Sequence, residues 1–66
     1  MIAFKVEDMT CGHCAGVITR AVKAADKEAE VRVNIGERLV EIEPKASDTN
    51  VLREAIVEAG YTPVDA

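Results

Sequence analysis

The sequence predicts an α+β fold in which two helices cover one face of a four-stranded antiparallel sheet. Apolar residues alternate in four short segments and recur at helical spacing in two longer ones. These segments follow one another as strand, helix, strand, strand, helix, strand, which is the split βαβ order. With 66 residues, the chain has room for one small domain, which is expected to span residues 1–66.

The outer ends of the chain are both expected to be strands. Residues 2–7 alternate, so that one face carries Ile2, Phe4 and Val6. Residues 61–65 predict a short last strand. Pro63 confines it to an edge of the sheet, because proline cannot donate a hydrogen bond to a central ladder.

A hairpin is expected in the middle of the chain. Residues 30–35 and 39–43 alternate, and the segment around Gly36 has the composition of a turn. Pro44 ends the second strand. The side chains expected to face the core are Val31, Val33, Ile35, Val40 and Ile42.

Two amphipathic segments predict helices. The first runs from residue 12 to residue 25, with Thr10 as its expected N-cap and an apolar stripe of Cys14, Ile18, Ala21, Val22 and Ala25. The second starts at Ser47 or Asp48 as cap and ends at Gly60. Its stripe consists of Leu52, Ala55, Ile56 and Ala59.

Composition excludes several classes of function. A formal net charge of −4 argues against a nucleic-acid partner, since phosphate binding needs a positively charged face. There is no run of about 18 apolar residues, so no membrane insertion is expected. The chain enters a strand pattern at once, without the basic start and apolar segment of a signal peptide, which predicts a cytoplasmic protein.

Residues 8–14 read DMTCGHC, and this cysteine pair is compatible with redox chemistry or with metal binding. A dithiol oxidoreductase of the thioredoxin type needs a CxxC pair at a helix start, where the helix dipole lowers the thiol pKa. Cys11 and Cys14 meet that condition. That fold is considerably longer than this chain, however, and it normally has an aromatic residue at the position of Thr10. The redox function is therefore the less favoured one.

Metal binding fits the pair better. Thiolates are soft ligands that prefer Cu(I) and Hg(II) and, to a lesser extent, Zn(II) and Cd(II). In the cytosol, two nearby cysteines are more often metal-binding or catalytic than a structural disulfide. A structural zinc site needs four ligands, whereas Cu(I) is satisfied by two thiolates in a near-linear arrangement. The ligand count therefore favours Cu(I).

The motif MTCGHC, within this order of elements, closely resembles the heavy-metal-associated domain family, and the resemblance covers the whole chain. This family includes small cytosolic copper chaperones and the N-terminal domains of copper-exporting P-type ATPases. Met9, Cys11 and Cys14 match its MxCxxC motif, and EAGYTPV matches its C-terminal end. The resemblance implies a ferredoxin-like sandwich that binds one Cu(I) through Cys11 and Cys14 and is not an enzyme.

Two positions beside the cysteines bear on the metal. Relatives that export zinc, cadmium or lead often carry an acidic residue where this chain has the neutral Thr10, so Thr10 favours copper. The family usually has glycine where this chain has Asp8. A carboxylate there raises the zinc alternative.

Three further residues are expected near the metal. Met9 is expected to anchor the loop in the core, with a third-ligand role as the alternative. His13 is expected to face solvent, because the cysteines on either side of it must point inward. Its alternative roles are a third ligand or a ligand to copper shared by two monomers. By resemblance, Tyr61 lies beside the metal loop and shields the sulfurs; the alternative is an ordinary aromatic that closes the sheet.

Three basic residues share one face of the first predicted helix. Arg20, Lys23 and Lys27 lie at i, i+3 and i+7, and the stripe is expected to flank the metal loop. Such a stripe is usually a solvated face. It is also a candidate surface for docking to an acidic partner.

Together these observations predict a copper chaperone that passes Cu(I) by ligand exchange to a metal-binding domain of a copper-transporting P-type ATPase. Two chains can also share copper through their loops, as a copper-bridged homodimer. The alternatives are a mercury- or zinc-binding domain of the same fold and an N-terminal domain of the ATPase itself. A dithiol oxidoreductase is less favoured, and a purely structural module leaves the cysteine pair unexplained.

Overall fold

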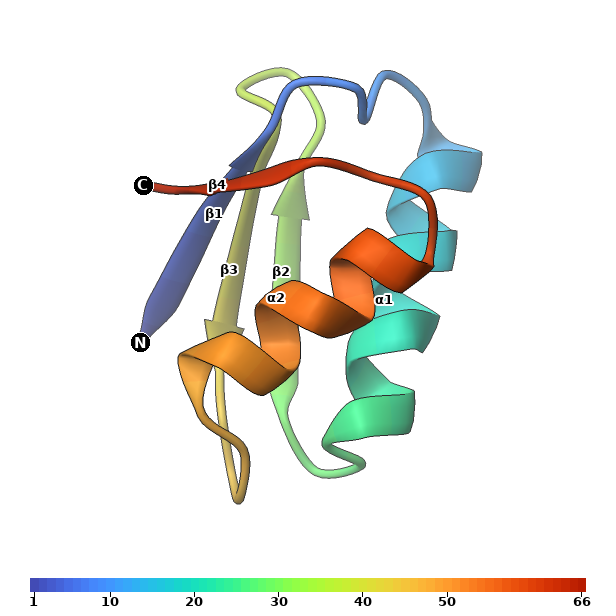
Figure 1. Ribbon diagram of the computed structural model, residues 1–66. Coiled ribbons are helices and arrows are strands. Elements are labelled where there is room, and N and C mark those ends of the chain that lie inside the picture. The colour runs from blue at the N-terminus through green and yellow to red at the C-terminus, as the bar shows by residue number, and fades with distance from the viewer.

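Two helices pack on one face of a four-stranded sheet (Figure 1). The computed structural model describes residues 1–66. Its elements are β1 (Ile2–Val6), α1 (Gly12–Ala25), β2 (Glu30–Asn34), β3 (Leu39–Glu43), α2 (Thr49–Glu58) and β4 (Pro63–Asp65). The strands pair antiparallel in the order β2-β3-β1-β4, which confirms the ferredoxin-like fold. Neither helix is long and apolar enough to span a lipid bilayer.

The strand register explains how the alternating pattern builds a core. Phe4 of β1 pairs with Val40 of β3, which pairs in turn with Val33 of β2. Directly paired residues project from the same face of a sheet, so these three side chains form one row beneath the helices. A second row repeats the arrangement two residues along each strand, with Ile2, Ile42 and Val31.

The helices bury the large residues of the apolar stripes expected of them, whereas Ala25 at the end of the first stripe is exposed. Ile18 and Val22 of α1 and Leu52 and Ile56 of α2 are fully buried. They join Met9, Ala29 and the strand residues Phe4, Val6, Val40 and Ile42 in a single core of ten buried side chains. Burial of one large aliphatic side chain is worth about 1.5–3 kcal/mol. The stability of so small a chain therefore depends on these few contacts.

The N-cap residues of the two helices were predicted only in part. Thr10 was expected to cap α1, but the cap is Cys11, whose backbone is extended (φ −151°, ψ 168°) and whose side chain makes no capping hydrogen bond. For α2 the cap is Asp48, not Ser47. The Asp48 carboxylate accepts a hydrogen bond from the Val51 N–H at 2.9 Å.

The strands are shorter than expected where turns begin. β1 ends at Val6, because Glu7 already belongs to the turn that leads to the cysteines. β2 ends at Asn34, because the Ile35 carbonyl accepts a hydrogen bond from the Arg38 N–H at 3.1 Å and so opens the hairpin turn. Ile35 is consequently 37% exposed and does not join the core. The last strand begins only at residue 63.

Gly60 ends α2 by a Schellman motif. Its φ of 100° is a left-handed conformation that favours glycine. The Gly60 N–H donates to the Val57 carbonyl at 3.0 Å, and the Tyr61 N–H donates to the Ile56 carbonyl at 3.3 Å. The motif reverses the chain, so that the segment after α2 runs back toward β1 and the loop that follows it (Figure 1).

Asp26 joins the end of α1 to the loop before α2. Its Oδ2 atom accepts hydrogen bonds from the Lys45, Ala46 and Ser47 N–H groups at 2.8–3.2 Å and from the Ser47 hydroxyl at 2.8 Å. These donors, led by the Ala46 N–H, hold the pKa of the Asp26 carboxyl well below its usual range. Asp26 is the one buried polar or charged residue of the chain.

Candidate metal site

The loop between β1 and α1 presents both cysteines at one end of the molecule. Met9 is fully buried beneath this loop, in the place expected of a core anchor. Cys11 is exposed, and Cys14, in the first turn of α1, is half-buried against the core. Residues three apart share a helix face, so the two Sγ atoms lie 3.1 Å from each other.

The start of α1 favours ionised sulfur. No side chain caps this helix, so its first N–H groups and its partial positive charge act on the thiols. The pKa of Cys14 falls from 9.0 to about 7, mainly through hydrogen bonding from the Tyr61 hydroxyl and then from the Cys11 thiol and the Thr10 backbone.

Tyr61 is half-buried against the core, and the structure brings it to Cys14. The same interaction raises the pKa of Tyr61 to about 12, so its hydroxyl keeps its proton at neutral pH. A protonated hydroxyl beside a thiolate is a hydrogen-bond donor to it. Tyr61 is thus placed to stabilise negative charge on the Cys14 sulfur.

No third ligand joins the two thiols. The chain contains no group of three or more His, Cys, Asp or Glu side chains arranged to hold an ion. His13 is exposed, and the Asp8 carboxylate accepts a hydrogen bond from the Thr62 N–H at 3.3 Å. The donor set therefore fits an ion that is satisfied by two soft ligands and not one that needs a tetrahedral protein site.

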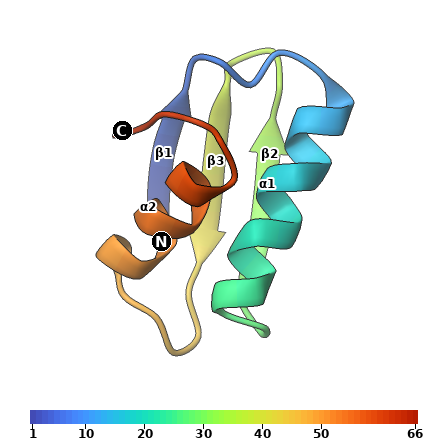
Figure 2. The same cartoon turned by 45° about the vertical axis from the view of Figure 1, so that its right-hand side comes forward.

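The expected basic stripe beside the cysteines does not form. α1 ends at Ala25, so Lys27 lies in the following turn and outside the helix. Lys23 lies in the last turn, roughly 18 Å along the helix axis from Cys11. Figure 2 shows that this end of α1 is opposite the loop that carries the cysteines. The helix stops there because Asp26 takes an extended backbone conformation (φ −143°, ψ 93°).

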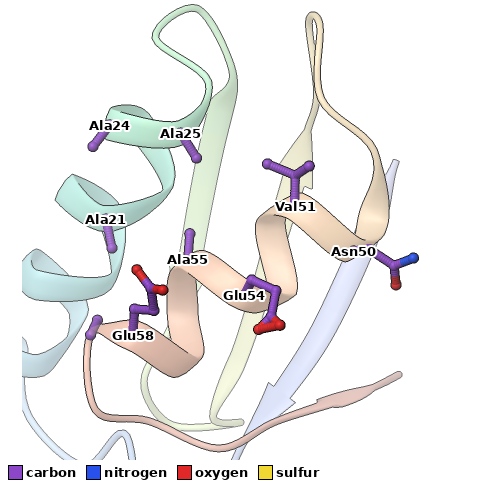
Figure 3. Close-up of a pocket in the computed structure, with 9 residues that line it drawn as sticks. Ala21, Ala24, Ala25, Asn50, Val51, Glu54, Ala55 and Glu58 are labelled. Carbon is purple, nitrogen blue, oxygen red and sulfur yellow. The ribbon is translucent and has the colours of Figure 1, made fainter.

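The largest hollow in the surface lies away from the cysteines. It is a shallow groove between α1 and α2, lined mostly by small apolar side chains, with Glu54 and Glu58 beside them (Figure 3). None of its lining residues belongs to the metal loop. The cysteine pair is therefore an exposed surface site, open to a second protein, and not an enclosed cavity.

Comparison with known proteins now decides the family. Residues 3–62 match the profile of the Heavy-metal-associated domain. The chain belongs to the heavy-metal-associated domain family. This heavy-metal-associated domain is also 34% identical over 59 residues to the copper chaperone CopZ of Staphylococcus epidermidis, a match that covers 86% of this chain and 87% of CopZ.

Solved structures of similar domains support the same fold. A gold-binding protein superimposes with a TM-score of 0.93 at 30% identity, over the full length of both chains. A point variant of the copper chaperone Atx1 from Synechocystis PCC6803, in a trimeric form, gives a TM-score of 0.92 at 34% identity. That match covers 97% of this heavy-metal-associated domain and 100% of Atx1.

One contact near the cysteines could not be predicted from the sequence. Asp8 and Thr62 are 54 positions apart, and Asp8 lies outside the predicted strands and helices. Their hydrogen bond exists only because the fold brings the end of the chain back beside β1. The departure of Asp8 from the usual family glycine was the only signal that singled out this position.

Proposed function

We propose that residues 1–66 form a single heavy-metal-associated domain that acts as a copper chaperone and binds one Cu(I) between the Cys11 and Cys14 thiolates. The observation that carries this proposal is the exposed pair of thiols, 3.1 Å apart, with no third ligand beside it. Copper is named in the relatives CopZ and Atx1. Gold is also a soft metal, so the gold-binding relative supports a site selective for soft ions.

The two sulfurs have different parts in capture of the ion. A metal held about 2.3 Å from each of two sulfurs in a near-linear arrangement requires them to be farther apart than 3.1 Å. Cys14 is half-buried and fixed by the first turn of α1. Cys11 is exposed at the cap, so it is the sulfur that moves outward to admit the ion.

Release uses the same asymmetry. An incoming thiolate attacks the exposed two-coordinate ion and gives a three-coordinate intermediate. The Cys11 sulfur then leaves first, because Cys11 is exposed and Cys14 is restrained by its packing against the core. The step exchanges ligands on the metal without oxidation or reduction, so the protein is not acting as an enzyme.

The proposed receiver is the CxxC pair of a metal-binding domain in a copper-transporting P-type ATPase, and the proposed location is the cytoplasm. Arg20, exposed on α1, is the docking residue nearest the cysteines among the three basic ones. Lys23 and Lys27 contribute only if the partner extends along the whole helix. A homodimer bridged by copper is a second arrangement that the exposed loop permits.

A transfer assay tests this function. The Cu(I)-loaded protein is mixed anaerobically with a metal-free domain that carries a CxxC pair, the two proteins are separated, and copper is measured in each. We expect copper to equilibrate between them, and we expect Cys14→Ser to retain too little copper to transfer. Copper that stays on the donor contradicts a chaperone. Tighter retention of Zn(II) or Hg(II) than of Cu(I) in parallel competitions supports the mercury- or zinc-binding alternative, and turnover of a disulfide substrate supports the oxidoreductase.

A further inference from the structure

We propose that Asp8 is a positioning residue that holds Tyr61 beside the Cys14 sulfur by tying the start of the last strand to the metal loop. The Asp8 Oδ1 atom accepts a hydrogen bond from the backbone N–H of Thr62, the residue after Tyr61, at 3.3 Å. As far as it concerns copper, this inference rests on the proposed function. The tie itself is a property of the metal-free protein.

The segment that carries Tyr61 has few other attachments. The Schellman motif holds the Tyr61 N–H on the α2 side. Pairing of β4 with β1 starts only two residues after Tyr61, where Pro63 lies opposite Val6. Between them, the Thr62 N–H has no backbone partner, and Pro63 has no N–H to donate. The Asp8 carboxylate therefore makes the hydrogen bond that joins this segment to the metal loop.

Asp8 belongs to an anchored part of the loop, so its hydrogen bond can hold Thr62 in place. It lies between the end of β1 and Met9, whose side chain is fully buried and whose N–H donates to the Val6 carbonyl at 3.1 Å. The loop on this side is therefore anchored. A hydrogen bond from an anchored carboxylate restricts where Thr62, and with it the Tyr61 ring, can lie relative to Cys14.

The same bond also affects the choice of metal. A free carboxylate next to two thiolates is a hard ligand of the kind that zinc accepts. Here the carboxylate is engaged by a backbone N–H and is not grouped with the cysteines. Asp8 thus supports a two-thiolate site while it adds negative charge to the loop.

The test compares four proteins: the wild type, Asp8→Ala, Asp8→Asn and the charge control Glu7→Gln. Asparagine keeps the acceptor oxygen, and alanine removes it. Glu7 is adjacent, exposed and paired with Arg38, so its loss changes charge without touching Thr62. Tyr61 is the only tyrosine and the chain has no tryptophan, so intrinsic fluorescence reports on this one ring.

In the metal-free protein, Asp8→Ala is expected to speed amide exchange of Thr62 roughly threefold to tenfold, the range for loss of one ordinary hydrogen bond. In the same variant, quenching of Tyr61 fluorescence by a soluble quencher is expected to increase. In the loaded protein, release of Cu(I) to a competing thiol is expected to accelerate by a similar factor. Asp8→Asn and Glu7→Gln are expected to stay near the wild type in all three measurements.

Unchanged Thr62 exchange and unchanged quenching in Asp8→Ala would overturn the tie. Altered exchange with an unaltered rate of copper release would overturn the role in positioning Tyr61 for the metal. If the wild type does not hold Cu(I), the proposed function fails, while exchange and quenching of the metal-free protein still decide whether Asp8 holds this segment. Asp8 is exposed, and Asp8→Ser, whose side chain is too short to reach Thr62, serves as a second variant if the alanine variant does not fold.

Discussion

The sulfurs of Cys11 and Cys14 lie 3.1 Å apart, yet their surroundings differ: Cys11 is exposed at the cap of α1, and Cys14 is half-buried against the core. The pKa of Cys14 is lowered to about 7, mainly by the Tyr61 hydroxyl. One sulfur is therefore fixed and readily ionised, and the other is free to move. This asymmetry is what a site needs if it must hold an ion firmly and still release it to another thiolate.

The first prediction concerns ionisation of Cys14. In the metal-free, reduced protein, we expect the ultraviolet absorbance of the thiolate to rise with a midpoint near pH 7. In Tyr61→Phe the midpoint is expected to move up toward 9.0, because the hydroxyl is the largest stabiliser of the charged sulfur. A wild-type midpoint near 9, or one that is the same in both proteins, contradicts the role given to Tyr61.

The lowered pKa of Cys14 also has a consequence for stability. Since the folded pKa lies below the value of 9.0 for an ordinary thiol, ionised Cys14 stabilises the fold fully above pH 9. This contribution is lost as the pH falls through about 7. Urea denaturation across this range should show a dependence on pH that Cys14→Ser lacks.

The second prediction concerns Asp26, whose carboxylate accepts four hydrogen bonds from the loop before α2. Asp26→Asn replaces an acceptor with a group that carries its own donors. We expect the Tm at pH 7 to fall by more than about 5 °C, since the loss of a buried hydrogen-bonded network is among the costly substitutions. Glu28→Gln, which changes an exposed carboxylate nearby, is the control and is expected to leave the Tm nearly unchanged.

The effect of Asp26 must depend on pH in one direction. Its folded pKa is lowered, so its contribution is present above the ordinary value of 3.8 and is lost as the pH falls toward the folded pKa. The difference in Tm between the wild type and Asp26→Asn should therefore shrink in acid. A difference that grows in acid, or an effect equal to that of Glu28→Gln, contradicts this account.

The third prediction compares neighbours on α2. Ile56 is fully buried, whereas Val57 is 48% exposed. Ile56→Ala is expected to lower the free energy of unfolding by about 2–5 kcal/mol, because it leaves a cavity in the core. Val57→Ala should change it by less than about 0.5 kcal/mol. A chain of this size has only a few kcal/mol of stability, so circular dichroism at room temperature should already show Ile56→Ala partly unfolded.

The fourth prediction concerns the contact between α2 and the last strand. The Arg53 Nη2 atom donates to both Asp65 carboxylate oxygens, at 2.7 and 2.9 Å, and the guanidinium lies 5.8 Å from the Phe4 ring centre. Both partners are solvent-accessible. A double-mutant cycle with Arg53→Ala and Asp65→Ala is therefore expected to give a coupling of only about 0.5–1 kcal/mol, smaller at high salt. A coupling of zero in low salt contradicts a stabilising contact.

Much of the fold could be predicted because local patterns determine it. Alternation placed Phe4 and Val40 on the inner face of the sheet, and the structure pairs them there. The helical stripe with Ile56 marked the buried face of α2, and Gly60 marked its end. Each of these predictions depends on residues close in sequence and on the characteristic repeat of side chains in a strand or in a helix.

What could not be predicted depends on contacts between distant segments. Thr10 looked like a cap because its hydroxyl suits one, but the N-cap residue is the next one, Cys11. The end of α1 at residue 25 was expected, but the hydrogen bonds from residues 45–47 to Asp26, which follows it, were not. At the cysteines, the positions of Tyr61 and Asp8 depend on the return of the chain after α2. Family resemblance indicated the position of Tyr61, but no periodic pattern indicated that of Asp8.

The central claim is that two thiolates, from Cys11 and Cys14, form the complete protein ligand set for one Cu(I). Its most direct test is an anaerobic titration of the reduced protein with Cu(I) against a chromophoric chelator, alongside Cys11→Ser. We predict a one-to-one complex that outcompetes the chelator in the wild type and is lost in the variant. Weak binding that the variant leaves unchanged would contradict the claim.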